Sequence, residues 1–435
     1  MIPLEMKPKI KELHNAFFKE EFIKEFIYMF LKDSRDFNFD DEISKDFKEL
    51  LIKAKKEYED KKKEDEKKKK KKISISKNLV SKEKMLTIKE FKCLFMYANS
   101  LLIEEEYSEL IKKEKQFGNY LIKLDKKVFN SKVRTRCYDI YKKNGKKDIE
   151  LINNFEELFK ENFYKNRMCR NIGVIKFKNI ENMNEVQREG IESKDWCAYL
   201  YTFLLGISVC PYCNSQYIYT YQNKNKGKIR AELDHCFPKV HHPFLAVSLF
   251  NLVPSCSQCN SSLKGSTDIG IDSVMNVFTE SFLDKYKFYI HSEKSIESFI
   301  GNSLDYDIKI VYDKNYPHSV RLKKFIESFH IENRYNFFKK YLNEQIYYQV
   351  NHSKSYNNFL QELLKDIPDK ESIHIHRRKY IEERNENRLL GKLVSDILDD
   401  KELTINNFET NNNFETKNYK ETFLDEKTLK QDMNT

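Results

Sequence analysis

The sequence predicts a mainly α-helical protein with a small α+β module near the middle of the chain. Apolar residues recur at three- and four-residue steps on both sides of that middle, which is the period of an amphipathic helix. Short alternating segments typical of strands are confined to residues 216–235 and to two stretches beyond residue 280. The chain has 435 residues, 40% of them hydrophobic, which is enough for two or three domains with a proper core.

We expect residues 1–190 to form an N-terminal helical region. Helical spacing runs through residues 8–58 and returns over 86–130 and 150–170. In between, residues 61–72 contain only Lys, Glu and Asp. A segment with no apolar side chain to bury predicts a charged linker or an exposed helix, which we place at residues 60–75.

The central module is predicted over residues 195–270. It begins with the apolar stretch 196–205, which predicts a buried helix that ends at Gly206. Residues 216–235 then alternate between β-branched or aromatic and polar side chains, with a Lys- and Asn-rich stretch in the middle. This pattern predicts two strands joined by a basic loop.

The C-terminal part, residues 271–400, is predicted to begin with short strands and to continue as a second helical region. The strand patterns lie at 285–290 and 307–312, and helical spacing follows them. Residues 401–435 are rich in Asn and charged side chains and contain the sequence Asn-Phe-Glu-Thr twice. Such low complexity predicts a disordered tail.

Two Cys-x-x-Cys pairs within the central module predict a zinc site. The four cysteines are Cys210, Cys213, Cys256 and Cys259. A Cys-x-x-Cys turn directs two sulfurs at one point, and a second pair completes the tetrahedron that Zn²⁺ prefers. Four thiolates leave no open coordination position, so we expect this zinc to be structural.

The segment between the pairs resembles the HNH endonuclease family. His235 follows Asp234, Asn251 lies in a Phe-Asn-Leu-Val-Pro stretch, and Asn260 directly follows the second pair, where an Asn replaces the last His of the family pattern. The resemblance covers residues 205–270. It implies a ββα-metal core with structural zinc, flanked here by helical regions.

The resemblance assigns each of these residues a role in phosphodiester hydrolysis. His235 is the expected general base, because a neutral imidazole accepts a proton from water at cellular pH. Asp234 and Asn260 are the expected ligands of a catalytic divalent ion, and their oxygen atoms suit Mg²⁺ or Mn²⁺. Asn251 is expected to tie the loop and orient His235.

DNA is the expected substrate, with RNA left open, and the resemblance implies products with a 5′ phosphate. The stretch from Cys236 to Leu252 is also similar to HNH effectors of bacterial antiphage systems, such as the nuclease that works with the Septu ATPase. The chain has no Walker-type phosphate-binding sequence of its own. A separate ATPase subunit is therefore the expected partner.

A second interpretation is a noncatalytic zinc-stabilised module that binds nucleic acid or protein, in which Asp234 and His235 have structural roles. Tyr217, Tyr219 and Tyr221 suit either base stacking or strand packing, and we favour packing. His241 and His242 are expected on the surface of a loop.

Charge and composition add little to the functional prediction. The formal net charge is +10, but residues 53–72 hold 12 Lys against 6 Asp and Glu, so the excess is largely local. The nine cysteines form no dense framework, which favours a reducing cytosol. With neither a signal region nor an apolar run of membrane-spanning length in the sequence, we expect a cytoplasmic protein without membrane association.

Overall fold

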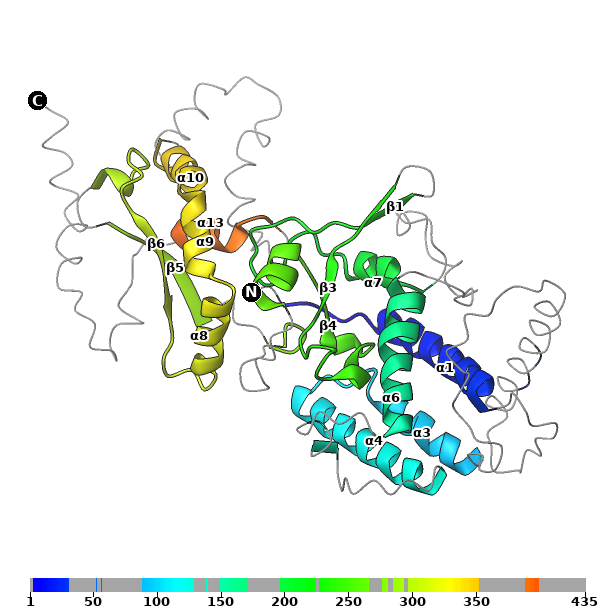
Figure 1. Ribbon diagram of the computed structural model, residues 1–435. Coiled ribbons are helices and arrows are strands. Elements are labelled where there is room, and N and C mark those ends of the chain that lie inside the picture. Colours follow the sequence, from blue (N-terminus) through cyan, green and yellow to red (C-terminus); the bar gives the residue numbers. More distant parts are fainter. Residues whose placement is uncertain are drawn as a thin grey trace, which may run out of the picture. The chain divides into compact units, whose positions relative to one another are not determined.

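Figure 1 shows the computed structural model of the protein. The described residues are 3–30, 52, 56, 88–128, 138–139, 142, 149–169, 196–223, 227–265, 276–280, 285–292, 296–351 and 388–398. The charged segment at 60–75 and the tail at 401–435 lie outside them. The chain divides into two compact units: Met1–Asp284 with Val320–Tyr335 and Asn385–Lys392, and Lys285–Ser319 with Asn336–Arg384 and Leu393–Thr435.

The described residues are mainly helical, as the sequence predicts, and their strands are short. In the first unit the N-terminal helices are α1 (Pro8–Phe30), α3 (Ile88–Ser100), α4 (Tyr107–Val128) and α6 (Glu150–Glu157), and α6 continues into the wider helical turns of η1 (Leu158–Cys169). No helix of the described ranges is both long and apolar enough to cross a membrane.

An aromatic core joins these helices to one another and to the central module. Phe22 of α1 lies against Phe91 of α3 and Phe155 of α6, with ring centroids 5.9 and 6.3 Å apart. Phe117 of α4 meets Phe244 edge to face, with centroids 4.9 Å apart. Because Phe244 belongs to the short helix η4 (Pro243–Leu245), the N-terminal helices pack directly against the loop that follows His235.

The central module begins with α7 (Ala198–Leu205), which ends at Gly206 as predicted. Gly206 has a φ of 71°, a left-handed conformation that Gly adopts without the strain of a Cβ. The hairpin of β1 (Tyr221–Asn223) and β2 (Gly227–Ile229) follows, in antiparallel register with Tyr221 opposite Ile229. The predicted hairpin is therefore present, although the range 216–235 also contains the start of a second strand pair, and residues 224–226 of the predicted basic loop lie outside the described residues.

A second antiparallel pair carries the Asp-His dipeptide. It consists of β3 (Glu232–His235) and β4 (Leu252–Ser255), with Asp234 opposite Val253 and His235 opposite Leu252. The connection contains η4 and η5 (Leu249–Asn251), and β4 leads within two residues to the helical turns of η6 (Gln258–Lys264). The chain order is thus strand, strand, helix.

Two further helices of the first unit, α8 (Ser319–Ser328) and α9 (Ile331–Tyr335), contact the module from far along the sequence. Phe329, between them, stacks on Tyr212 with ring centroids 4.7 Å apart, and the hydroxyl of Tyr335 donates to the main-chain oxygen of Cys213 (2.6 Å). The first Cys-x-x-Cys turn is therefore packed against a segment more than 100 residues away.

The second unit contains the predicted strand pair β5 (Tyr286–His291) and β6 (Asp307–Tyr312), antiparallel with Ile290 opposite Ile308. The other elements assigned to it are η8 (Ile296–Ser298), η9 (Asn336–Phe338), α10 (Lys339–Asn351) and most of α13 (Gly391–Leu398). Gly301 has a φ of 80°, and a Cβ there would lie 2.5 Å from the main-chain nitrogen of Tyr347. Only glycine allows this approach of the loop to α10.

Candidate zinc and histidine site

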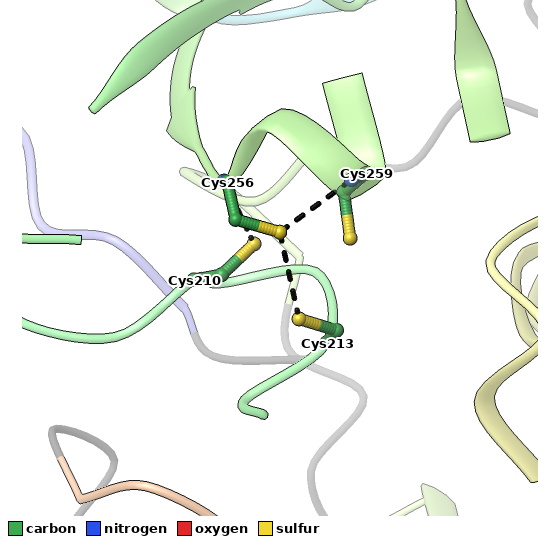
Figure 2. A group of neighbouring side chains, drawn as sticks. All are labelled: Cys210, Cys213, Cys256 and Cys259. Atoms are coloured by element: carbon green, nitrogen blue, oxygen red, sulfur yellow. Dashed lines mark hydrogen bonds between the residues drawn. The ribbon is translucent and has the colours of Figure 1, made fainter. Parts of the chain in front are cut away.

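The four predicted zinc ligands lie together. Figure 2 shows Cys210 and Cys213 on one loop, facing Cys256 after β4 and Cys259 in η6. All four are buried, and their sulfurs lie within 4.8 Å of one another, with 3.9 Å between those of Cys213 and Cys256. Four sulfurs about 2.3 Å from a tetrahedral Zn²⁺ are separated by about 3.8 Å. The cluster could therefore bind a metal such as zinc.

Main-chain and side-chain donors surround these sulfurs. The N–H groups of Cys256 and Cys259 donate to the sulfurs of Cys210 and Cys256, each at 3.4 Å. Arg334 of α9 donates from Nη1 to Cys259 Sγ at 3.1 Å. Burial lowers the pKa of Arg334, but the neighbouring thiolates of Cys213 and Cys259 outweigh this and raise it. Such donors stabilise sulfur in its thiolate form, the form that binds metal.

His235 is held at the end of β3 in one defined orientation. It is buried, its ring lies edge to face with that of Tyr164 (centroids 4.6 Å apart), and its Nε2 lies 3.0 Å from the main-chain oxygen of Ala246. A carbonyl oxygen only accepts, so Nε2 carries the proton of the neutral ring. Nδ1 then keeps its lone pair and is the basic nitrogen.

Burial keeps this ring neutral. It lowers the pKa of His235 to about 3, and the positive charges of Lys239 and Lys264 add to the effect. The ammonium of Lys239 also lies over the Tyr164 ring, 4.7 Å from its centroid. Lys239 thus places a positive charge beside the neutral base, whereas the ammonium of Lys264 is already paired with Asp234 (2.8 Å).

Asn251 fixes the loop between β3 and β4, as expected. Its side-chain oxygen accepts from the N–H of Phe237 (2.7 Å), and its amide donates to the main-chain oxygens of Leu245 (2.9 Å) and Phe237 (3.2 Å). Leu245 precedes Ala246, which holds the imidazole. Because Asn251 is fully buried and uses both ends of its amide, it holds the chain at Leu245, directly before the residue whose carbonyl contacts His235.

Asp234 occupies a different environment from His235. Consecutive strand residues point to opposite faces, so the carboxylate is directed away from the imidazole. One oxygen accepts from the hydroxyl of Tyr212 (2.7 Å) and the other from Nζ of Lys264 (2.8 Å), all three groups being buried. Lys264 also donates to the main-chain oxygen of His235 (2.5 Å).

Asn260 interacts with Glu232 instead of with Asp234 or His235. Its amide donates to Glu232 Oε2 at 2.8 Å, and Ser261 donates to the same oxygen. The expected convergence of Asp234, His235 and Asn260 on one ion is therefore not what these contacts show. Glu232, Asp234 and Asn260 do carry the hard oxygen ligands of Mg²⁺ or Mn²⁺. An ion that used Asp234 has to displace the ammonium of Lys264.

The histidines after the motif divide into two environments. His241 is exposed, as predicted. His242 is buried and lies with Nδ1 2.6 Å from the carboxylate of Glu114 in α4, so the predicted surface role is wrong for this residue. Only the tertiary packing of α4 on the loop reveals the pair, because Glu114 is 128 residues away.

Two of the three alternating tyrosines are also placed differently from the prediction. Tyr217 and Tyr219 are 61% and 58% exposed, so the packing interpretation is wrong for them. Tyr221, in β1, is partly buried.

Comparisons with protein-family models, with curated proteins and with solved structures found no match to this chain.

Proposed function

We propose that the protein is an HNH-type endonuclease that hydrolyses phosphodiester bonds in nucleic acid, with His235 as general base. The observation that carries the proposal is the fixed tautomer of His235. The Ala246 carbonyl holds the proton on Nε2, which leaves Nδ1 to take a proton from an attacking water. Lys239, whose charge acts on the ring, favours a phosphate group beside it.

The order of strand, strand and helix around this histidine supports the same proposal. The zinc cluster lies at both ends of the segment, because Cys210 and Cys213 precede β3 while Cys256 and Cys259 follow β4. A metal bound there would hold β4 and η6 against the loop before β3. We propose that it is a structural zinc and that the core is of the ββα-metal type.

A catalytic divalent ion remains part of this proposal, and Asp234 and Asn260 would hold it once the ammonium of Lys264 has left Asp234. When bound, such an ion supplies positive charge for the phosphate and for the leaving oxygen. Around it the chain itself orients the imidazole through Asn251 and Ala246 and excludes bulk water by burying His235. Lys264 is the internal cation that balances Asp234 in this structure.

Incubation of the purified full-length chain with nucleic acid and Mg²⁺ or Mn²⁺ tests the proposal. We expect circular DNA to be nicked or linearised, and His235→Ala to reduce cleavage at least 100-fold, because general base catalysis contributes about 10²–10⁴-fold. His241→Ala is the matched control, since this neighbouring histidine is exposed. Equal cleavage by the two variants would show that His235 is not the base.

The buried contacts of Asp234 favour a second candidate, a noncatalytic zinc-stabilised module that binds nucleic acid or protein. An aspartate whose two oxygens are used by Tyr212 and Lys264 has a complete structural role. Lys264→Met separates the candidates. In the nuclease, it frees Asp234 and lowers the Mn²⁺ concentration needed for binding, measured by electron paramagnetic resonance. In the structural module, it only destabilises the fold, because a buried carboxylate loses its cation.

A further inference from the structure

Three segments that are far apart in the sequence meet at the loop that carries Cys210 and Cys213. We call residues 210–215 the first cysteine loop. The other two segments are residues 329–335, which include α9, and residues 388–392, which include the start of α13. All three belong to the first unit, and the chain passes into the second unit directly after Tyr335 and directly after Lys392.

Residues 388–392 are attached to the first cysteine loop through one buried side chain, that of Asn214. The main-chain oxygen of Asn214 accepts from the N–H of Leu390 (2.7 Å), and its side-chain amide donates to the main-chain oxygen of Arg388 (2.9 Å). The N–H of Lys392 donates to its side-chain oxygen (3.4 Å). Because Asn214 directly follows Cys213, the attachment depends on the conformation of the cysteine loop.

Backbone strain is concentrated where these segments meet. Among the described residues other than Gly, those with a positive φ are Asn214 (50°), His330 (47°) and Leu390 (56°), and His330 directly precedes α9. A left-handed conformation is unfavourable for a residue with a Cβ and persists only where the surroundings hold it. A metal bound by Cys210 and Cys213 would fix the turn that ends at Asn214 and so supply this support.

The side chain of Arg334 connects α9 to both cysteine pairs. It donates from Nη1 to Cys259 Sγ (3.1 Å) and from Nη2 to Gln258 Oε1 (3.0 Å) and Ser215 Oγ (3.4 Å). Four thiolates around one divalent ion leave an excess of negative charge in a buried place, which needs a cation beside it. Arg334 supplies that cation, and the hydroxyl of Tyr335 adds a bond to the main-chain oxygen of Cys213 (2.6 Å).

We propose that metal binding at the four cysteines is coupled to the docking of residues 329–335 and 388–392, with Arg334 as the positioning residue that couples them. The inference rests on the part of the proposed function that assigns zinc to the cluster, and it is independent of hydrolysis. Coupling is reciprocal, so docking that raises the zinc affinity by some factor is itself favoured by zinc to the same extent. Loss of zinc then loosens the two stretches after which the chain enters the second unit.

Competition with a chromophoric chelator measures the zinc affinity of the full-length chain. We expect Arg334→Met to weaken zinc binding about 10- to 100-fold, as removal of other outer partners of metal ligands does. Arg334→Lys keeps the charge but not the planar fork and should recover part of the loss. The matched control is Arg321→Met in α8, because the guanidinium of Arg321 pairs with Glu280, outside the cluster, and its loss should leave zinc affinity unchanged.

A milder pair of variants tests the same coupling if Arg334→Met does not fold. Tyr335→Phe removes only the hydroxyl that donates to Cys213, and we expect zinc binding to weaken about 2- to 10-fold, the worth of one hydrogen bond. Tyr306→Phe removes a hydroxyl that donates in the same way to the main-chain oxygen of Lys339 (2.9 Å), in the second unit. This control should keep the full zinc affinity.

Hydrogen–deuterium exchange of the full-length chain, with zinc and after removal of zinc by a chelator, measures docking directly. We expect zinc removal to accelerate amide exchange in residues 329–335 and 388–392 at least 10-fold more than in α4 or in the pair of β5 and β6. Both segments hold strained residues at the contact with the cysteine loop, so they are expected to open before the packed helices.

Equal acceleration throughout the first unit, or none in the two segments, overturns the proposal, because zinc would then support the unit as a whole or not reach these segments. Full zinc affinity in both Arg334→Met and Tyr335→Phe, or an equal loss in their controls, also overturns it. An unmodified chain that binds no zinc refutes the proposed zinc site together with the coupling. Zinc binding without these differences refutes the coupling alone.

Discussion

The pH dependence of stability at His14 provides a direct test of the packing between the N-terminal helices and the central module. His14 of α1 is fully buried. Its Nε2 lies 2.6 Å from the main-chain oxygen of Val247, and its Nδ1 accepts from Nε1 of Trp196 at 3.1 Å. Both ring nitrogens are used by the neutral imidazole, with the proton on Nε2.

Protonation of His14 is therefore unfavourable in the folded state. Burial lowers its pKa from 6.5 to about 4, although the hydrogen bond with Val247 opposes the shift. The unfolded chain binds a proton near pH 6.5 that the folded chain does not bind until near pH 4. This contribution to stability is complete above pH 6.5 and is lost as the pH falls towards 4, at about 1.4 kcal/mol per pH unit. At pH 5 the loss is about 2 kcal/mol.

Urea unfolding followed by tryptophan fluorescence measures this loss locally, because Trp196 is the single Trp of the chain and contacts His14. The reference is His14→Phe, which leaves the Trp196 N–H and the Val247 carbonyl without this partner at a cost of about 1–3 kcal/mol each, at every pH. Other titrating groups, His235 among them, contribute equally to both proteins. We expect the difference in the free energy of unfolding between the unmodified protein and His14→Phe to shrink by about 2 kcal/mol between pH 7.5 and pH 5. Parallel pH profiles would refute the buried neutral His14.

Two other predictions concern the metal cluster and a close contact of α4. Cys259→Ser should abolish tight zinc binding, measured by mass spectrometry of the purified protein, and should strongly reduce the thermal stability of the first unit. The control is Cys93→Ser, which lies outside the cluster and should retain one zinc. Gly118→Ala should lower the free energy of unfolding by about 1–3 kcal/mol despite the better helix propensity of Ala, because a Cβ there lies 2.3 Å from the ring of Tyr138. A stabilised Gly118→Ala protein in the same urea assay would contradict the second of these.

Local patterns predicted the elements of the described chain well. Apolar spacing identified the helical stretches around α1, α3, α4 and α6, and alternation identified the strands within residues 216–235 and the pair of β5 and β6, because both signals depend on neighbours within one or two turns. Alternation missed β4, because all four of its residues are buried. Gly206 ended α7 for the same local reason. Other wrong predictions concerned exposure: His242 is buried against α4, and Tyr217 and Tyr219, which precede β1, are exposed.

The candidate site shows the same division. The spacing of two Cys-x-x-Cys pairs was enough to predict the cluster, since each short turn sets the direction of its own sulfurs. The partners of Asp234 could not be predicted in this way. Lys264 is 30 residues from it, and many lysines of similar sequence environment lie on the surface.

The sequence by itself determined that the chain forms helices around a short-stranded module with four gathered cysteines, because propensity, periodicity and turn geometry act over a few residues. Only the tertiary structure decided which groups face each other. Trp196 meets His14 across 182 residues, and Arg334 reaches Cys259 across 75. Such contacts depend on how whole elements pack, and packing is set by the combined shape and burial of many side chains rather than by any local pattern.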